Sequence, residues 1–249
     1  MQRRRFLAAL ATIGACPFCI PGVLAAEGSH WTYSGQAGPD HWGDLDHANA
    51  ACSIGSQQSP LDIRNSIRGS LPAIKPSWNE GGRMVNNGHT IQVNVPPGSK
   101  LARGSASYEM LQYHFHHPSE HLVDGKAFAM EAHFVHKNVA TNELGVLGVL
   151  LVNGKANAAF TSLAAAFPAE EGAEVAVGTV DPRGLLPERL GYWFYEGSLT
   201  TPPCTENVDW MLAEAPLEVA ASDIQRFSKL FPSNARPAMP AHRRLILSS

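Results

Sequence analysis

The chain has 249 residues, 44% of them hydrophobic, and a formal net charge of -3 with 16% charged residues. A chain of this kind can bury a sizeable core without a network of disulfides. The missing basic excess argues against a nucleic-acid partner, and the 22 glycines and 18 prolines favour many turns between short strands.

The N-terminus has the three parts of an export signal. Three arginines at positions 3–5 precede an apolar run over residues 6–20, and small residues follow it. The run is too short to span a membrane, and this order of regions is typical of a cleaved leader. We therefore predict a twin-arginine-like signal peptide over residues 1–25. Residues 26–249 would then form a periplasmic or secreted domain without a transmembrane segment. Two alternatives stay open: an amphipathic first helix, and a lipoprotein cleavage box at Cys16 that would leave a lipid anchor.

Cys52 and Cys204 are the cysteines of the predicted mature domain, because Cys16 and Cys19 lie inside the predicted signal. In an oxidising compartment, two cysteines suggest one bridge. That bridge would close a loop of about 150 residues and stabilise the fold by about 3–5 kcal/mol if unstrained. Two separate buried thiols are the alternative.

The remaining elements are expected in chain order. Residues 31–60 are rich in glycine, proline, tryptophan and histidine and are expected to form irregular, well-anchored surface chain. Apolar runs, alternating or continuous, predict strands over residues 91–95, 108–116, 128–136, 146–152, 192–195 and 208–212. The nearly unbroken run at 146–152 is typical of a central strand covered on both faces. An alanine-rich segment over 158–167 and a capping-box sequence at Ser222–Gln225 predict two helices.

Together these elements predict a mainly β (α+β) fold. We expect a single domain built on a large central, mostly antiparallel β-sheet with a few short peripheral helices. No internal repeat, charge block or long linker divides the sequence.

A cluster of histidines carries the strongest functional signal: six of the eleven lie between residues 114 and 136. His114 and His116 are two residues apart in a predicted strand, so their side chains share one face. His133 lies in the next predicted strand, within reach if the two strands pair as antiparallel neighbours. Three neutral imidazoles can fill three corners of a tetrahedron around zinc and leave the fourth open for water, as in a catalytic site. A purely nitrogen donor set excludes calcium and magnesium, but not copper or iron.

Two neighbours sharpen this pattern. Gln112 precedes His114 by two residues, and Glu131 precedes His133 by two, so each shares a face with its histidine. Such side chains can accept the second imidazole N–H, which fixes the tautomer and raises the basicity of the ligand. Incidental surface or core histidines are the alternative for this pattern taken alone.

Several strings of the sequence together resemble the α-class carbonic anhydrases. They span roughly residues 31–247 and follow the order of that family. The strings are GPDHW over 38–42, QSPLDI over 58–63, NNGH over 86–89, QYHFH over 112–116, SEH over 119–121, EAHFVH over 131–136, YEGSLTTPP over 195–203 and NARP over 234–237. His117 and Pro118 stand where animal members have Trp-Gly, which narrows the resemblance to bacterial members.

The resemblance implies zinc-dependent, reversible hydration of carbon dioxide to bicarbonate and a proton, by attack of zinc-bound hydroxide. Slow ester hydrolysis would be a side activity, and the protein would be a monomer or homodimer. One alternative is a non-catalytic carbonic-anhydrase-like binding module, although such modules have lost a zinc histidine. Another is a different exported zinc protein, a hydrolase or a metal scavenger, but the sequence lacks the H-E-x-x-H pattern of a common protease type.

The resemblance also implies a role for each site residue. His114, His116 and His133 bind zinc. Thr200 accepts a hydrogen bond from the hydroxide and donates one to Glu120, which orients the attack.

His89 matches the proton shuttle, since an imidazole can take and release protons near neutrality. Thr201 contacts bicarbonate, and an apolar wall receives carbon dioxide. The wall residues are Val135, Val146, Leu199, Val208 and Trp210. Tyr33, Asn87 and Gln92 match positions that line the cavity or hold its water chain. A bridge between Cys52 and Cys204 fits the bacterial members and would hold the loop that carries Thr200.

Overall fold

Residues 30–249 are described by a computed structural model; the predicted signal peptide, with Cys16 and Cys19, lies outside these residues. Thirteen of the fifteen strands form one large sheet, and β1 and β8 form a separate parallel pair. The strands are β1 (Asp62–Ile63), β2 (Ile67–Arg68), β3 (Ile74–Ser77), β4 (Arg83–Asn86), β5 (Ile91–Asn94), β6 (Lys100–Arg103), β7 (Ala106–His116), β8 (Leu122–Val123), β9 (Met130–Asn138), β10 (Leu144–Asn153), β11 (Glu174–Ala176), β12 (Tyr192–Ser198), β13 (Glu206–Ala213), β14 (Leu217–Val219) and β15 (Leu247–Ser248).

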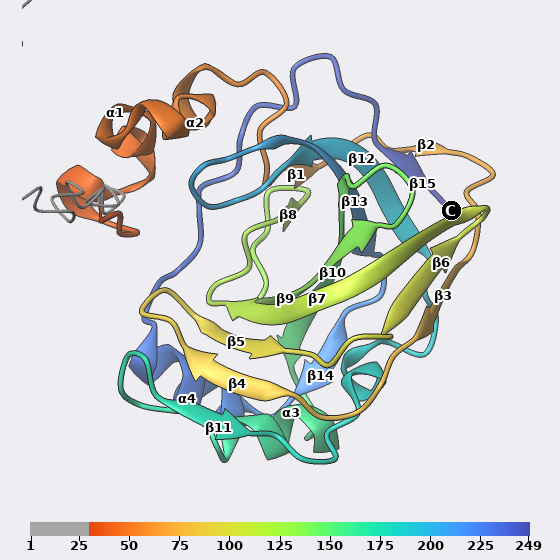
Figure 1. The fold of residues 1–249 in the computed structure, drawn as a ribbon. Coiled ribbons are helices and arrows are strands. Elements are labelled where there is room, and N and C mark those ends of the chain that lie inside the picture. Colours follow the sequence, from red (N-terminus) through yellow and green to blue (C-terminus); the bar gives the residue numbers. More distant parts are fainter. Residues whose placement is uncertain (1–29) are drawn as a thin grey trace, which may run out of the picture.

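The large sheet follows the order β11-β4-β5-β7-β9-β10-β13-β12-β15-β2, with β3, β6 and β14 attached to its side (Figure 1). Most neighbours are antiparallel, as predicted. The parallel pairs of the large sheet are β10 with β13, β10 with β14 and β15 with β2. Strand β10, predicted as central from its apolar run, lies between β9 and β13 and is buried along most of its length.

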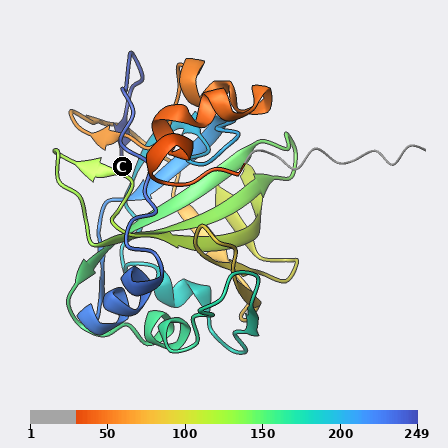
Figure 2. The ribbon, with the colours of Figure 1, turned by 90° about the vertical axis from the view of Figure 1, so that its left-hand side faces the viewer.

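The helices are few and short, as predicted: α1 (Trp42–Leu45), α2 (Ala51–Ile54), α3 (Ala158–Ala164) and α4 (Ala221–Leu230), with 3-10 turns η1 (Gly35–Ala37), η2 (Pro39–His41), η3 (His47–Asn49) and η4 (Pro182–Leu185). Helices α3 and α4 lie together below one face of the sheet in both views (Figures 1 and 2). Phe160 and Leu163 of α3 and Phe227 of α4 are fully buried there, in one cluster with Phe115 and Phe134 of the sheet. The main core is therefore the layer between this face and the two helices.

The two faces of β7 and β9 have different fates because side chains alternate along a strand. Tyr113 and Phe115 of β7, like Phe134 of β9, point into the core above α3 and α4. The residues between them, which include the predicted metal ligands, point to the opposite face of the sheet. This alternation positions the candidate site on the face that the helices leave open.

Helix boundaries differ from the sequence prediction at both long helices. Ser222 does not cap α4: the helix begins at Ala221 after an extended Ala220, and no side chain caps it. Ser222 already lies inside the first turn, so its hydroxyl cannot serve the donors of that turn. Helix α3 ends at Ala164 and not at 167, and Pro168 disfavours a helical conformation at Phe167.

The segment over 31–60 was predicted to be irregular, and this was wrong in part. It contains the short turns and helices η1, η2, α1, η3 and α2. Trp42 is fully buried, and its indole N–H donates to the carbonyls of Thr32 at 2.9 Å and Ala37 at 3.1 Å. These two bonds hold residues 32–42 together, and Trp42 packs in one buried cluster with Cys52 and Cys204, which attaches this segment to the loop at Cys204. Among residues 30–249, no helix is long and apolar enough to cross a membrane.

Candidate active site

Three histidines from two neighbouring strands meet on the open face of the sheet. His114 and His116 come from β7, and His133 of β9 is the direct antiparallel partner of His114. The ring centroids lie 5.0 Å (114–116), 5.2 Å (114–133) and 4.6 Å (116–133) apart. One ring nitrogen from each falls within 4.8 Å of those of the other two. The set is close enough to hold one metal ion.

In two of these rings, one nitrogen is hydrogen-bonded to the side chain of the residue two positions earlier in the sequence. His114 Nδ1 lies 2.8 Å from Oε1 of Gln112, and His133 Nε2 lies 2.7 Å from Oε1 of Glu131. Both acceptors require an N–H on that nitrogen, so the other nitrogen carries the lone pair. His114 therefore offers Nε2 to a metal, and His133 offers Nδ1.

The third ring is held by the main chain. His116 Nδ1 donates to the carbonyl of Asn234 at 2.7 Å. Its Nε2 is buried and has no hydrogen-bond partner within residues 30–249. An unpartnered buried acceptor is rare, and a metal ion beside the other two imidazoles would satisfy it. The donor set thus fits a three-histidine zinc site.

The surroundings of these rings favour the neutral, ligating form at two positions. Burial lowers the pKa of His114 well below its usual range, and the charges of His116 and His133 add to the effect. Burial likewise lowers the pKa of His116, although the nearby Glu120 opposes it. A neutral imidazole is the form that binds a metal.

Glu131 accepts several hydrogen bonds from the residues around the three histidines. Besides His133, its carboxylate accepts from His121 Nδ1 at 2.6 Å and from the backbone N–H groups of Glu120 and His121 at 3.0 and 2.8 Å. Burial opposes ionisation of Glu131, but His121 and His133 outweigh it and hold its pKa well below the usual range. His121 in turn contacts the hydroxyl of Tyr195 at 2.6 Å. His121, Glu131 and His133 also form a compact group of potential metal ligands, but hydrogen bonds among them already occupy these atoms.

Glu120 lies beside the triad and is only 1% exposed. Its Oε1 accepts the backbone N–H of Arg236 at 2.8 Å, whereas Oε2 has no hydrogen-bond partner among the described residues and lies 3.9 Å from Nδ1 of His133. Thr200 is also buried, yet within residues 30–249 the structure gives it no hydrogen bond to Glu120. The relay between these two residues therefore stays a prediction, and the free carboxylate oxygen is the acceptor that it would need.

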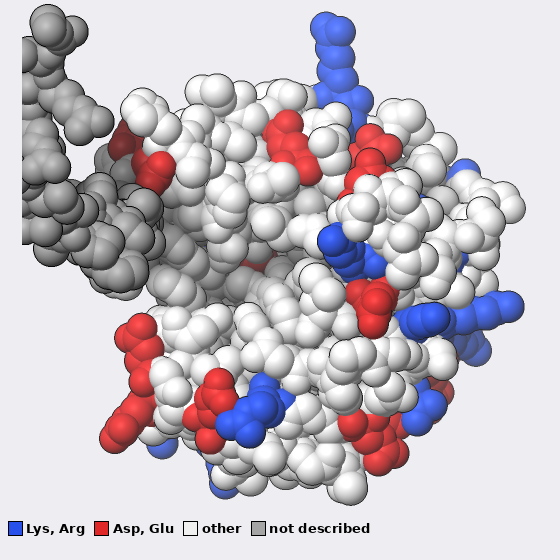
Figure 3. All heavy atoms as spheres, viewed as in Figure 1, with Lys and Arg blue, Asp and Glu red and all other residues white. Residues whose placement is uncertain are grey.

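A cavity of about 120 Å³ leads to His114 and His116. It includes five residues that the resemblance placed around the site: His89, Thr201, Tyr33, Asn87 and Gln92. The complete lining is Trp31, Tyr33, Asn87, His89, Thr90, Gln92, Gln112, His114, His116 and Thr201. Figure 3 shows a hollow near the centre of the face seen in Figure 1, with acidic and basic side chains scattered around it.

His89 is half-buried at the mouth of this cavity. Burial lowers the pKa of its imidazole, and the charge of His30 adds to this while Glu171 opposes it. Tyr33, also in the lining, is different, because burial and then the charge of Glu120 raise the pKa of its hydroxyl well above the usual range. Tyr33 is therefore a neutral hydrogen-bonding group, and His89 is a titratable one.

The predicted apolar wall forms a separate cluster beside the triad. Val135 pairs with Val146 across β9 and β10, and Val146 pairs with Trp210 across β10 and β13, so the three stand in one row on the open face. The Trp210 ring lies 4.9 Å from the His133 ring. Val208 belongs to the same buried cluster, and Leu199 packs against it.

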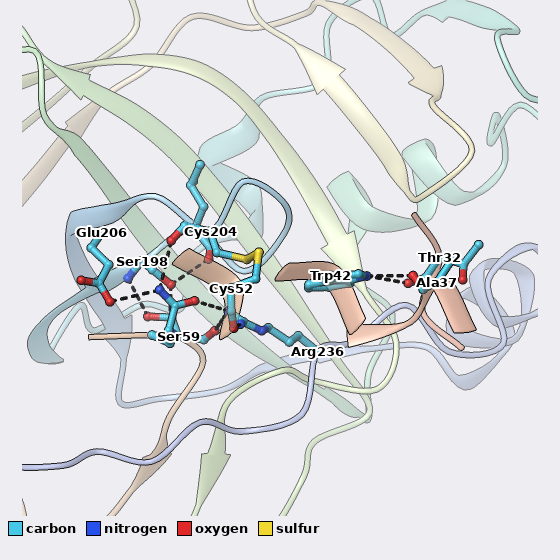
Figure 4. The surroundings of a disulfide bond; sticks show 11 residues. Thr32, Ala37, Trp42, Cys52, Ser59, Ser198, Cys204, Glu206 and Arg236 are labelled. Atoms are coloured by element: carbon cyan, nitrogen blue, oxygen red, sulfur yellow. Dashed lines mark hydrogen bonds between the residues drawn. A yellow bond between two sulfur atoms is a disulfide. The ribbon is translucent and has the colours of Figure 1, made fainter. Parts of the chain in front are cut away.

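The disulfide between Cys52 and Cys204 is present, as predicted. Figure 4 shows its surroundings, in which Arg236 donates to the carbonyl of Cys52 at 3.0 Å and Gln58 donates to the carbonyl of Cys204, also at 3.0 Å. Arg236 also donates to Oε1 of Gln58 at 2.9 Å. The bridge and these bonds fix the loop that follows Thr200 to the N-terminal segment.

Sequence reasoning assigned no role to several residues of the site. Asn234 and Arg236 lie in a string that matches the family, but a main-chain carbonyl or N–H leaves no mark in a sequence. His121 lies in another matching string, and its position directly after Glu120 was the available signal. Gly148 is the partner of His133 on β10, and a Cβ there would lie 2.8 Å from Cδ1 of Leu212. A side chain at position 148 would have to push Leu212 aside, so the glycine permits this close packing next to His133.

Comparisons with known proteins point to one family. The profile of the family described as eukaryotic-type carbonic anhydrase matches residues 37–249. A carbonic anhydrase of Nostoc sp. is 37% identical over 239 residues, which cover 93% of this chain and 90% of the relative. One of Neisseria gonorrhoeae is 39% identical, with 92% of each chain covered. The α-carbonic anhydrase of Thermovibrio ammonificans, solved with the inhibitor sulfanilamide, superposes with a TM-score of 0.86 at 38% identity and covers 88% of this chain and 99% of its own.

Proposed function

We propose that this chain, which belongs to the eukaryotic-type, or α-class, carbonic anhydrase family, hydrates carbon dioxide reversibly. The zinc ion for this reaction would be held by His114, His116 and His133. The family makes the chain a carbonate dehydratase; the metal and the residue roles are the proposal. The unpartnered, buried Nε2 of His116 beside two more imidazoles supports it most directly.

Zinc in such a site acts as a Lewis acid. In carbonic anhydrases generally, it lowers the pKa of the water bound to it to about 7. The acceptors around the ligands matter because each fixes the tautomer and aim of one ring. Gln112 and Glu131 do this from side chains, and the carbonyl of Asn234 does it for His116.

Glu120 and Thr200 would orient the attacking oxygen. A threonine hydroxyl that donates its hydrogen to the free Oε2 of Glu120 can only accept from the nucleophile, so it selects an oxygen that carries a proton. The low exposure of both residues excludes water that would compete for these bonds. The backbone N–H of Arg236 holds the other oxygen of Glu120 and so fixes the carboxylate.

Carbon dioxide has no charge or donor to hold, so it needs an apolar surface beside the metal. The row of Val135, Val146 and Trp210, completed by Val208 and Leu199, would supply that surface. Thr201, which lines the cavity, would contact bicarbonate. His89 would carry the released proton towards the cavity mouth, because an imidazole titrates near neutrality.

The test is stopped-flow hydration of carbon dioxide by protein of known zinc content. Activity should rise with zinc up to one ion per chain and should be blocked by sulfanilamide, the inhibitor bound to the Thermovibrio relative. Equal rates with and without one zinc per chain would contradict the proposal.

We also propose that residues 1–25 are removed on export and that residues 26–249 act as one α-carbonic anhydrase domain in the periplasm or outside the cell. The disulfide supports this, because such bonds persist in oxidising compartments. N-terminal sequencing of the exported protein checks the cleavage site, and its mass shows whether a lipid is attached. A protein that keeps its arginines at positions 3–5 would contradict the proposal.

A further inference from the structure

Two neighbouring residues of the N-terminal segment meet the candidate shuttle. The indole of Trp31 stacks on the imidazole of His89 with centroids 3.7 Å apart and an interplanar angle of 7°. The ring of His30 lies 6.0 Å from that of His89, tilted by 38°. His30 is exposed, whereas His89 is half-buried. The two imidazoles therefore lie one after the other between the cavity and solvent.

The tryptophan in this arrangement is firmly braced. Trp31 makes edge contacts with Tyr33 and Trp42, with centroids 5.3 and 5.1 Å apart. Trp42 is fully buried and anchored by the carbonyls of Thr32 and Ala37 (Figure 4). Trp31, the residue next to His30, is thus held by packing against Tyr33 and the hydrogen-bonded Trp42, which keeps His30 close to His89.

The backbone of His89 is fixed from the other side. Oδ1 of Asn87 accepts the N–H groups of His89 and Thr90 at 3.0 and 2.9 Å. Asn234, whose carbonyl holds His116, donates its side-chain N–H to the carbonyl of His89 at 3.0 Å. Trp31 covers one face of the imidazole, and this leaves proton exchange possible because the ring nitrogens exchange protons in the plane of the ring, at its edge.

We propose that His30 is a second proton carrier, which takes the proton of the hydration reaction from His89 and releases it to buffer. This inference rests on the proposed function. The step breaks an N–H bond of protonated His89 and forms one on His30. A centroid separation of 6.0 Å suits transfer through about one water molecule. His30 then loses its proton to buffer, and no other bond changes.

Charge gives this step a direction. Two imidazolium groups at this separation repel each other, so a proton on one ring disfavours a second proton on the other. The groups whose charges act on His89 are His30, which opposes its protonation, and the exposed Glu171, which favours it. Because His30 is the more exposed of the two imidazoles, a shared proton is lost from it to solvent.

The experiment uses the zinc-loaded protein and its variants His30→Gln, His89→Ala and the double substitution. In weak buffer, His30→Gln should lower the maximal hydration rate by about two- to fivefold, less than the large factors of a primary acid–base group, because His89 can still reach buffer directly. Added imidazole should restore the rate. His30→Gln should not slow the His89→Ala protein further, since the two residues act in series. An exposed histidine elsewhere, replaced in His47→Gln, is the matched control and should change nothing.

A second readout is independent of turnover. Proton NMR titration of the His89 ring should show a higher pKa in His30→Gln, because a neighbouring positive charge has been removed. A merely structural His30 would leave the titration unchanged, and either that result or an unchanged rate in weak buffer would overturn the proposal. An equal loss in the His89→Ala background would overturn it too. An inactive wild type with one zinc per chain would instead contradict the proposed function itself.

Discussion

Strand β9 carries His133 and His136, three residues apart, on its two opposite faces. His133 faces the open side, where Oε1 of Glu131 holds its Nε2 and two more imidazoles stand beside its Nδ1. His136 faces the core, where its Nδ1 donates to the carbonyl of Phe134 at 2.8 Å and its Nε2 is buried without a partner among the described residues. Both side chains are almost completely buried, so burial does not separate them.

What separates the two histidines is the charge placed around them. Burial lowers the pKa of His133, but the carboxylate of Glu131 outweighs it and raises that pKa above the usual range. Among residues 30–249 no carboxylate is recorded in contact with His136; its ring lies 5.6 Å from that of Trp78, and burial lowers its pKa to about 4. A histidine-rich strand thus makes a metal site on the face where acceptors and further imidazoles converge, and a neutral core residue on the other.

Removing each histidine in turn should give the largest difference between the two faces of β9. His133→Ala leaves two imidazoles, and we expect zinc affinity to fall by more than about a hundredfold, beyond the usual effect of losing a partner of a ligand. Hydration should fall with it. His136→Asn should keep one zinc per chain, because its side chain points away from the site. Zinc analysis after dialysis and stopped-flow rates check both variants. Full zinc content in His133→Ala, or loss of zinc in His136→Asn, would show that the two faces are not distinct.

The lowered pKa of His136 should make the folded protein less stable in acid. The folded pKa of His136, about 4, lies below its ordinary value of 6.5, so the unfolded chain binds the extra proton between these pH values. Stability contributed by the neutral ring is complete above pH 6.5 and is lost as the pH falls towards 4. The loss amounts to about 3 kcal/mol. Urea unfolding at several pH values, with zinc in excess, measures it.

His136→Asn is the matched variant for this measurement. Its amide can still donate to the carbonyl of Phe134, but it does not titrate. The difference in unfolding free energy between wild type and variant should therefore change with pH only between about 4 and 6.5. His242→Asn on the surface serves as the control. A difference that stays constant across that window would show that His136 is not the group responsible.

The same alternation explains what could be predicted from the sequence. A period of two placed His114 and His116 on one face, and a two-residue spacing placed Gln112 and Glu131 beside their histidines. It gave no signal for Asn234, because a carbonyl 118 residues away from His116 acts through the backbone and not through its side chain. The prediction that Ser222 caps helix α4 was wrong. The sequence pattern does not show that Ala220 is the last extended residue and that the helix already begins at Ala221.

Gln112 and Glu131, the two side chains that hold a histidine ligand, differ in burial, and we expect this difference to have the smallest effect. Gln112 is half-buried in the cavity wall, whereas Glu131 is fully buried and accepts four hydrogen bonds. Gln112→Leu should weaken zinc binding by about tenfold, the low end for a partner of a ligand. Water in the cavity can replace the lost acceptor on His114, which limits the damage.

Glu131→Gln is the variant that gives this prediction its scale. An amide has one acceptor oxygen, so it cannot serve the donors that now share two carboxylate oxygens, and water cannot enter to replace what is lost. Its effect should approach about a hundredfold. Competition with a chromophoric chelator measures both affinities, and a thermal unfolding curve of each variant shows that it is folded. If Gln112→Leu weakened zinc as much as Glu131→Gln, burial of the acceptor would not decide how strongly a ligand is held, and the orientation of His114 would have to depend on Gln112 alone.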